Sequence, residues 1–438
     1  MTGTYSYVYD GRGRPTSTSL TLAGPGAPQT TYTVATSYDD ADRPVTMSLP
    51  ATGDLPAETL SYAYNDGTDG GLSSLTSSLT SPTTTLFQQP TYTSQGLLNG
   101  WKSGVASGNP AWQASVSLGY DGDLRVTDSK LTRTDTISGL SLPIAEVQPA
   151  YDAAGNVSSV TTTLAAVGTT AGGSETQAFC YDDLDRLTWA GTSGTGPCGR
   201  AGSEEITGAG YTATYAYDTF DRLTSASVLN GSGIALPGAA QGTYTYSASG
   251  HLHAVSAVGS GATGYSAAYD AAGELTCRAV GASTCTNATP TGQALGYDAL
   301  RRLISWQDAS TTPTATGAYA YDGSGSRVWQ QDTSTSGGVT TTTTTTYILG
   351  VDEITSVQTG QAAASTTATR FYPLPGGVSA LRDAAGLSYV AGDQLGTPVA
   401  TLNLDTGRCW ASSPARPMGR HVTRRTCRLL AMSCRASG

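Results

Sequence analysis

The chain has 438 residues, and its composition is unusual: 54 Gly, 24 Tyr against 4 Phe, and a charged fraction of 13%, where ~25% is typical. Too few Leu and Phe remain for helical cores, whereas Thr and Tyr suit half-buried strands and Gly suits tight turns, so the composition predicts an all-β fold. All 33 acidic residues lie at or before Asp405 and seven of the 23 basic residues follow it, so residues 1–405 carry a net charge of −17, which argues against nucleic-acid binding.

The N-terminus begins almost directly with repeat-like sequence, Tyr5–Asp10, and no signal peptide precedes it. No apolar run of ~18 residues occurs in the chain, so we expect no transmembrane helix. We interpret the chain as a fragment of a longer protein whose export region lies elsewhere.

From the first residues onward, tyrosine is followed by aspartate far more often than chance would allow. Nine Tyr-Asp pairs occur, and three degenerate copies fill the gaps between them. The twelve tyrosines are spaced 23–36 residues apart, which is the mark of a repeat architecture. The pairs are Tyr9-Asp10, Tyr38-Asp39, Tyr120-Asp121, Tyr151-Asp152, Tyr181-Asp182, Tyr217-Asp218, Tyr269-Asp270, Tyr297-Asp298 and Tyr321-Asp322; the degenerate copies are Tyr64-Asn65, Tyr92-Thr93 and Tyr246-Ser247.

The residues after each tyrosine indicate a chain reversal. Gly stands four positions later in several copies, as at Gly13, Gly155 and Gly273, and Asp does so in others. Asp at the start of a turn accepts hydrogen bonds from the backbone ahead of it, and Gly or Asp at its end tolerates the left-handed conformation. Two residues further on, ten of the twelve copies have Leu, Val or Pro, which restarts an apolar face.

Before each turn, pairs such as Tyr7/Tyr9 and Tyr215/Tyr217 alternate with period two, which places both rings on one face of a strand. Each unit therefore predicts a β-hairpin. Single hairpins are marginal in water, but hairpins stacked side by side bury one another and remove exposed edges. We expect a spiralling sheet, open or incomplete, over residues 1–335.

Each repeat Asp admits two interpretations: a catalytic carboxylate or calcium ligand, or a cap on its own turn. Twelve near-equivalent copies favour the cap, because an active site needs one special constellation. The sequence predicts no catalytic residue, no cofactor and no metal site. His251 and His253 have no Cys or carboxylate cluster to complete a zinc site.

The seven cysteines are sparse. Cys180 and Cys198, like Cys277 and Cys285, are separated by Gly-, Thr- and Ser-rich loops, and these two pairs suit local disulfides in an oxidising compartment. Buried thiols are the alternative.

After the repeats, residues 336–346 contain the unbroken run Thr340–Thr346, which suits either a flexible spacer or a β-branched strand. We favour the spacer. Residues 347–419 form a further segment, and residues 420–438 are Arg- and Cys-rich and are expected to be disordered.

The pattern Y-x-Y-D-x-x-G-R-L over about three quarters of the chain resembles the YD repeats of bacterial RHS proteins, toxin-complex subunits and teneurins. The later segment resembles the RHS-associated core, with Gln394 in place of the usual His. Its matching residues are Asp393, Leu395, Gly396, Asp405, Gly407, Pro417 and Gly419.

The resemblance implies a secreted or cell-surface bacterial shell that encloses a C-terminal effector, and a self-cleavage site at D-P-x-G. Here Arg416 stands where that Asp is expected, so self-cleavage is in doubt because a guanidinium cannot do aspartyl chemistry. The 19 residues after Gly419 are too few for an effector domain.

Three hypotheses follow. The first is a structural shell without an enzymatic activity of its own. The second is a module that binds cell-surface carbohydrate through exposed tyrosine rows. The third is a polysaccharide-cleaving enzyme that uses paired carboxylates.

Overall fold

The structure is a computed structural model that describes residues 2–24, 27–67, 70–166, 172–206, 210–236, 241–247, 251–260, 264–280, 285, 292–308 and 314–411. Every regular element in these ranges is a β-strand, and the strands form one antiparallel sheet. This confirms the all-β expectation. None of the described segments forms a helix that could span a membrane.

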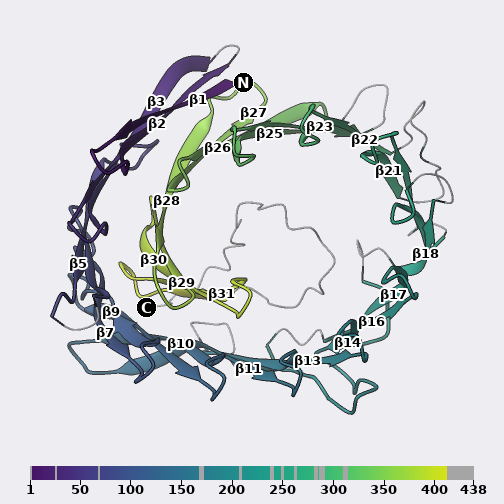
Figure 1. The fold of residues 1–438 in the computed structure, drawn as a ribbon, viewed down its shortest axis with the longest axis horizontal. Helices are drawn as coiled ribbons and strands as arrows, with labels where there is room; N and C mark the ends of the chain where they lie inside the picture. Colours follow the sequence, from purple (N-terminus) through teal and green to yellow (C-terminus); the bar gives the residue numbers. More distant parts are fainter. Residues whose placement is uncertain are drawn as a thin grey trace.

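The sheet curls into a ring that encloses an interior (Figure 1). The chain runs once around the ring from β1 to β27, and then turns inward, so that β28–β31 lie inside the ring against its own wall. The strands are β1 (Thr2–Tyr9), β2 (Pro15–Gly24), β3 (Ala27–Tyr38), β4 (Pro44–Leu49), β5 (Glu58–Tyr64), β6 (Leu72–Ser77), β7 (Thr85–Tyr92), β8 (Leu98–Lys102), β9 (Trp112–Tyr120), β10 (Val126–Asp135), β11 (Ser141–Tyr151), β12 (Val157–Leu164), β13 (Gly173–Tyr181), β14 (Leu187–Gly191), β15 (Ser203–Glu204), β16 (Tyr211–Tyr217), β17 (Leu223–Asn230), β18 (Gly242–Tyr246), β19 (Val255–Val258), β20 (Tyr265–Tyr269), β21 (Leu275–Val280), β22 (Gln293–Tyr297), β23 (Leu303–Asp308), β24 (Ala315–Tyr321), β25 (Arg327–Ser336), β26 (Val339–Ile348), β27 (Asp352–Thr359), β28 (Ser365–Pro373), β29 (Val378–Asp383), β30 (Gly386–Gly392), β31 (Pro398–Asn403) and β32 (Cys409–Ala411).

Each of the twelve repeat tyrosines is the last residue of a strand, and the next strand pairs back antiparallel. Each of these hairpins also shows a register shift where its tyrosine pairs, as between Val8 and Tyr9 or between Ala320 and Tyr321. Because the tyrosine-ending strands all run in the same direction, their turns lie along one rim of the ring. We call this edge the turn rim.

Two copies have longer turns than the repeat pattern predicts. The second arm after Tyr64 begins at Leu72, and the arm after Tyr246 begins at Val255 rather than at Leu252. Leu252 instead lies exposed in the turn. The extra residues are accommodated because a surface turn can lengthen without disturbing the ladder on either side.

The expectation of a spacer at residues 336–346 is wrong. Thr340–Thr346 lie within β26, which pairs with β25 on one side and β27 on the other. Their hydroxyls also bond across strands, as between Thr335 and Thr340. A run of β-branched side chains fits a strand that has two partners, and this context outweighs the low sequence complexity.

The residues of β28–β32 form an inner layer (Ser365–Ala411) whose apolar side chains share one core with the wall. Tyr372 and Tyr389 of the inner layer and Leu75 and Phe87 of the wall are almost fully buried in this core. The rings of Phe87, Trp101 and Tyr389 pack with centroids 5.3 and 5.8 Å apart. The layer therefore supplies the inner face of the wall strands with a hydrophobic partner.

A second, smaller core closes the ring where its two ends overlap. Leu20 and Leu22 of β2 pack with Val328 of β25 and Ile348 of β26. Tyr5 hydrogen-bonds to the side chain of Asp322. The pKa of Tyr5 is raised to about 12, mainly by burial and secondly by the Asp322 carboxylate. The first and last repeats are thus joined by side chains.

Candidate functional site: the repeat ladder and the inner layer

The aspartate of each repeat holds its own turn together. In the first copy, Asp10 Oδ1 accepts hydrogen bonds from the backbone N–H groups of Arg12 and Arg14, at 2.9 and 3.0 Å. The N–H of Gly13 donates to the carbonyl of Asp10 at 3.0 Å. The same set recurs at Asp298, in the eleventh copy. The site residues Asp39, Asp121, Asp152, Asp182, Asp218, Asp270 and Asp322 accept equivalent bonds.

These bonds favour the ionised carboxylate. The N–H of Arg14 is the main reason why the pKa of Asp10 lies below its usual value, and the N–H of Arg302 does the same for the pKa of Asp298. Bonding to backbone donors stabilises the charged form. Such aspartates are turn caps whose acceptor oxygens are already occupied.

In the copies where the structure describes it, the fourth residue after the tyrosine adopts a positive φ, which L side chains rarely do. Glycine provides it at Gly13, Gly155 and Gly273, with φ of 79°, 93° and 86°. Leu124 and Arg301 take the same conformation with φ of 65° and 61°, although residues of this type are unusual there. The turn is therefore imposed by its hydrogen bonds even where the preferred residue is missing.

From the second copy onward, each repeat tyrosine hydroxyl reaches back to the preceding repeat. The hydroxyl of Tyr151 donates to the carbonyl of Val126 at 2.9 Å, and that of Tyr321 donates to Leu303 at 2.7 Å. Every accepting residue begins the second arm of the repeat before. The remaining donors are Tyr38, Tyr64, Tyr92, Tyr120, Tyr181, Tyr217, Tyr246, Tyr269 and Tyr297. The repeat tyrosine is thus a link between neighbouring hairpins.

The arginine that follows the turn reaches forward. Arg186 Nε donates to Asp182 of its own turn at 2.8 Å, and Nη1 donates to the carbonyl of Asp218 in the next turn at 3.1 Å. Its guanidinium also lies 4.9 Å from the ring centroid of Tyr217. Cation–π stacking on the next tyrosine recurs at Arg14, Arg43, Arg125, Arg222 and Arg302.

The segment that resembles the RHS core contains one more turn of the same kind. Asp393 Oδ1 accepts from the N–H groups of Leu395 and Thr397, and Gly396 has a φ of 79°. Gly392 ends the strand where a repeat has tyrosine, and the register shifts at that residue. The motif Asp393–Gly396 is therefore a turn of repeat type, a relation that the sequence hides because the tyrosine is absent.

Asp405, the other core-like carboxylate, accepts a hydrogen bond from the N–H of Leu387 at 2.8 Å. No described contact joins Asp405 to Asp393. Gly407 gives its carbonyl to Arg133 of the wall, and it packs so closely against Trp112 that an added Cβ would overlap the indole. Arg416, Pro417 and Gly419, together with the tail at 420–438, lie outside the described residues.

The inner layer is fixed to the wall by a buried charged cluster that sequence reasoning missed. Arg370 of β28 is fully buried and bonds Asp352 Oδ1 and Oδ2 at 2.9 and 2.8 Å and Glu58 Oε2 at 3.0 Å. Tyr372 donates to Glu58, and Arg382 donates to Tyr372. The sequence offers one signal of this cluster, a lone arginine inside a Thr-rich strand. Its partner Glu58 is 312 residues away, so the pairing could not be read from local sequence.

Burial would lower the pKa of Arg370, but hydrogen bonds to Asp352 and Glu58 outweigh it and raise that pKa. Burial also raises the pKa of Tyr372. The cluster therefore consists of a cation with two carboxylates in the dry contact between wall and inner layer, and loss of one member would leave a buried charge without compensation.

Two glutamates face each other where β13 pairs with β15. Glu175 lies opposite Glu204, and burial, followed by the hydrogen bond to Glu204, raises the pKa of Glu175 to about 8. Glu175 also accepts from Gln177 at 3.0 Å, and Glu204 accepts from the N–H of Ile206 at 2.7 Å. This pair is suited to sharing a proton across two strands.

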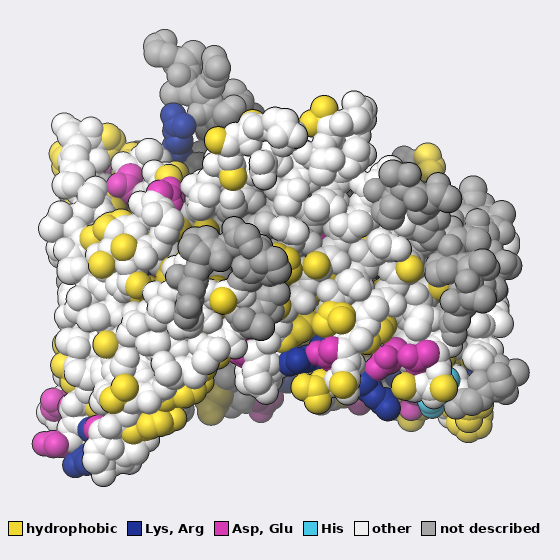
Figure 2. Space-filling view, turned by 90° about the horizontal axis from the view of Figure 1, so that it is seen from above, with side chains coloured by type: hydrophobic (Ala, Val, Ile, Leu, Met, Phe, Trp, Pro, Cys, Tyr) yellow, Lys and Arg dark blue, Asp and Glu magenta, His cyan; other side chains and the backbone are white. Residues whose placement is uncertain are grey.

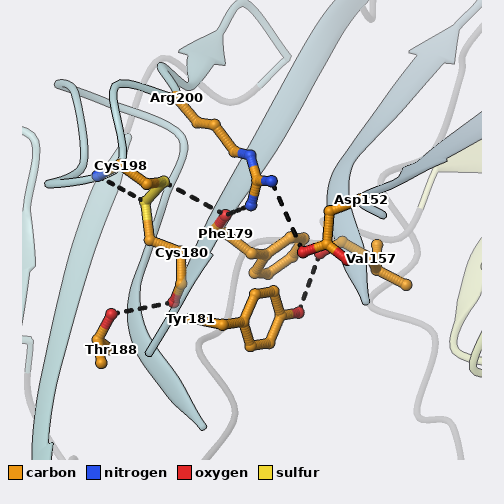
Figure 3. The surroundings of a disulfide bond; sticks show 8 residues. All are labelled: Asp152, Val157, Phe179, Cys180, Tyr181, Thr188, Cys198 and Arg200. Atoms are coloured by element: carbon orange, nitrogen blue, oxygen red, sulfur yellow. Dashed lines mark hydrogen bonds and ion pairs between the residues drawn. A yellow bond between two sulfur atoms is a disulfide. The ribbon is translucent and has the colours of Figure 1, made fainter. Parts of the chain in front are cut away.

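Figure 3 shows how a disulfide ties a long connection to the wall. Cys180 and Cys198 are bonded with Cα atoms 5.7 Å apart, and Arg200 beside them donates to the carbonyl of Phe179 at 2.7 Å. Arg200 also lies 3.6 Å from Asp152 of the preceding repeat. A second disulfide joins Cys277 to Cys285. The structure thus pairs the four cysteines that the sequence grouped.

Among the described residues, no three His, Cys, Asp or Glu side chains gather so that they could hold a metal ion. A pocket of about 290 Å³ lies near the core-like turn, between Tyr120 and Tyr151 of the wall and Gly376 and Asp393. Its walls are mostly apolar side chains and backbone.

No protein-family model matches the sequence, and no curated protein matches it. Solved structures do. A chain of the Photorhabdus luminescens Tc holotoxin pore with a TccC3 mutation superposes with a TM-score of 0.62 at 17% identity, covering 90% of this chain and 19% of that chain. The TcdB2-TccC3 crystal structure gives 0.64 at 17% identity over 92% and 20%, and TcdB2-TccC3-TEV gives 0.65 at 16% identity over 94% and 20%.

The shared feature is the fold. At these identities the likeness confirms the all-β shell architecture and no more, and this chain spans about a fifth of the length of those chains.

Proposed function

We propose that this chain is a structural section of a hollow β-shell that encloses polypeptide cargo, and that it acts as a container rather than as a catalyst. The observation that supports this most is the redundancy of the ladder: the same Tyr, Asp and Arg contacts recur from repeat to repeat, and they hold each turn together and join neighbouring hairpins. One of the solved structures with the same fold is, by its name, a Tc holotoxin pore, which supports a secreted carrier.

The position of the inner layer supports enclosure. β31 lies inside the ring (Figure 1), and β32 pairs with it and continues the inner layer. A polypeptide continued from Ala411 would therefore start inside the ring. Two disulfides are consistent with an oxidising compartment outside the cytosol.

Enclosure can be tested with a site for a sequence-specific protease placed directly after Ala411. A matched control carries the same site between Ser138 and Gly139, in the connection between β10 and β11. We expect the inner site to be cut at least ten times more slowly than the control in the folded protein, and equally fast after denaturation. Equal cleavage rates in the folded protein would contradict the proposal.

One observation favours carbohydrate binding as a second candidate. Tyr5, Tyr7 and Tyr9 stack with centroids 6.1 Å apart, and Tyr7 and Tyr9 are 51% and 57% exposed. Exposed tyrosine faces can stack on sugar rings. Loss of retention on a polysaccharide gel in the Tyr7→Ser, Tyr9→Ser variant would support this role.

A further inference from the structure

The turn rim exposes a row of large apolar side chains. Leu124, Leu184, Phe220, Leu252 and Leu300 lie in five of the seven turns from Tyr120 to Leu303 and are 49–71% exposed. Two intervening turns expose alanine, at Ala154 and Ala272. The lower edge of the view in Figure 2 shows hydrophobic side chains alternating with acidic and basic ones. Folding alone does not account for this row, because the turns require only Asp and a residue with positive φ.

The same turns are acidic. Between Tyr120 and Leu303 they contain eleven carboxylates and five arginines, a net charge of −6. Four of the arginines are used in ion pairs within their own turns, as Arg125 is with Asp121 at 2.8 Å. The carboxylates are Asp121, Asp123, Asp152, Asp182, Asp183, Asp185, Asp218, Asp221, Asp270, Glu274 and Asp298. A partner that covers the apolar row must therefore be basic.

The row is held rigidly. Arg186 Nη1 donates to the next turn at Asp218, and Arg222 Nη1 donates to the carbonyl of Leu252 at 2.9 Å. Asn156 Nδ2 donates to Asp185 Oδ1 of the following turn at 2.7 Å. Because hydrogen bonds join neighbouring turns, the exposed apolar side chains of the row (the tips) are held in place before a partner binds. This lowers the entropy lost on binding.

The spacing of the tips indicates the shape of the partner. Each repeat adds two strands about 4.8 Å apart, so neighbouring tips recur roughly every 10 Å. An α-helix rises about 1.5 Å per residue, and seven residues span a similar length. A helix with an apolar residue at every seventh position would present one side chain to each gap between tips.

We propose that the part of the turn rim over Leu184, Phe220 and Leu252 is a docking surface for a basic amphipathic helix of a partner protein. Its apolar stripe contacts the row of tips, and its flanking Lys and Arg side chains meet the carboxylates of the turns. The net negative charge disfavours an anionic membrane, and it also disfavours a second copy of the same rim.

The test uses the whole chain and a fluorescent 21-residue helical peptide with the repeat LKKLLKK, with binding followed by anisotropy. The rim variant carries Leu184→Ser, Phe220→Ser and Leu252→Ser, which lie in three consecutive tyrosine copies. The control variant carries Ile137→Ser, Leu140→Ser and Ile234→Ser, which are similarly exposed at the opposite ends of the strands. A peptide with Glu in place of Lys controls for charge.

We expect the rim variant to bind the basic peptide at least tenfold more weakly, about 1.4 kcal/mol, the control variant to bind like the parent, and the acidic peptide not to bind. Equal binding by parent and rim variant would overturn the proposal. So would an equal loss in the control variant. Flotation of the parent with anionic vesicles, or concentration-dependent dimers abolished in the rim variant, would overturn it in favour of a lipid or a second copy.

Discussion

The wall of the ring has two halves that share one ladder but differ in their cores. In the covered half, β4–β13, the inner face packs against the inner layer, and Leu60, Val116 and Leu131 are almost fully buried. In the uncovered half, β18–β25, the described residues contribute nothing to that core, and strands such as β22 are only half-buried throughout. The tyrosine hydroxyl bond is the same in both halves. Hairpin stacking therefore does not depend on the core that the wall shares with the inner layer, and that layer adds this core to half of the wall.

The largest effect is expected where the covered half meets the inner layer. Arg370→Leu leaves Glu58 and Asp352 buried without their cation, and loss of one partner of a buried ion pair typically costs about 3–5 kcal/mol. Chemical denaturation should show this loss. A triple variant with Glu58→Gln and Asp352→Asn added should recover part of it. A single variant as stable as the parent would show that the cluster does not hold the layer.

A matched pair of leucines compares the halves directly. Leu118 and Leu295 both lie two residues before a repeat tyrosine, but Leu118 is 9% exposed in the core whereas Leu295 is half-buried. Leu118→Ala should lower the free energy of unfolding by about 2–5 kcal/mol, and Leu295→Ala should lower it clearly less. Equal losses would mean that the uncovered half has a core of its own.

The glutamate pair tests the border between the halves. With the pKa of Glu175 raised to about 8, the folded state binds more protons than the unfolded chain between about pH 4.5 and pH 8, so stability falls as the pH rises through that window. In Glu175→Gln, we expect a flatter dependence of Tm on pH and a higher Tm than the parent at pH 8. Thermal melts across the window measure both. A parent whose Tm is unchanged there would rule out the shared proton.

The smallest effect tests the ladder. Tyr151→Phe in the covered half and Tyr321→Phe in the uncovered half each remove one hydroxyl–carbonyl bond. Each change should cost about 0.5–1.5 kcal/mol, and the two losses should match. A loss confined to the covered half would show that the bond depends on the core after all.

The sequence predicted the hairpin that each repeat forms. The twelve chain reversals between paired strands follow from local spacing, because a hairpin turn is decided by neighbouring residues. What depends on distant contacts was not predictable. Arg370 contacts Glu58, which is 312 residues away in the sequence. No residue near Thr340–Thr346 indicates that this run pairs with a strand on each side.

For the repeat side chains, the sequence predicted where they lie in the hairpin but not which neighbouring repeat they contact. The Asp of the repeat was predicted to cap its own turn and the Tyr to lie on one face of a strand, but the contacts of the Tyr hydroxyl and of the Arg with neighbouring repeats were not predicted. The tyrosine hydroxyl bonds backward and the arginine forward, which requires knowing how hairpins stack. The turn at Asp393 was hidden because Gly392 replaces the tyrosine that marks the others.

Many of the junctions are alike, because the tyrosines from the second copy onward bond backward and six of the repeats stack an arginine on the next tyrosine. Such a repeat presents the same carbonyl to its successor and the same ring to its predecessor. Duplication or deletion of a whole unit in the gene therefore changes the circumference without redesigning a junction. The circumference of the ring can therefore evolve in steps of one hairpin. The contact between Leu20 and Ile348, which closes the ring, has to be rebuilt each time.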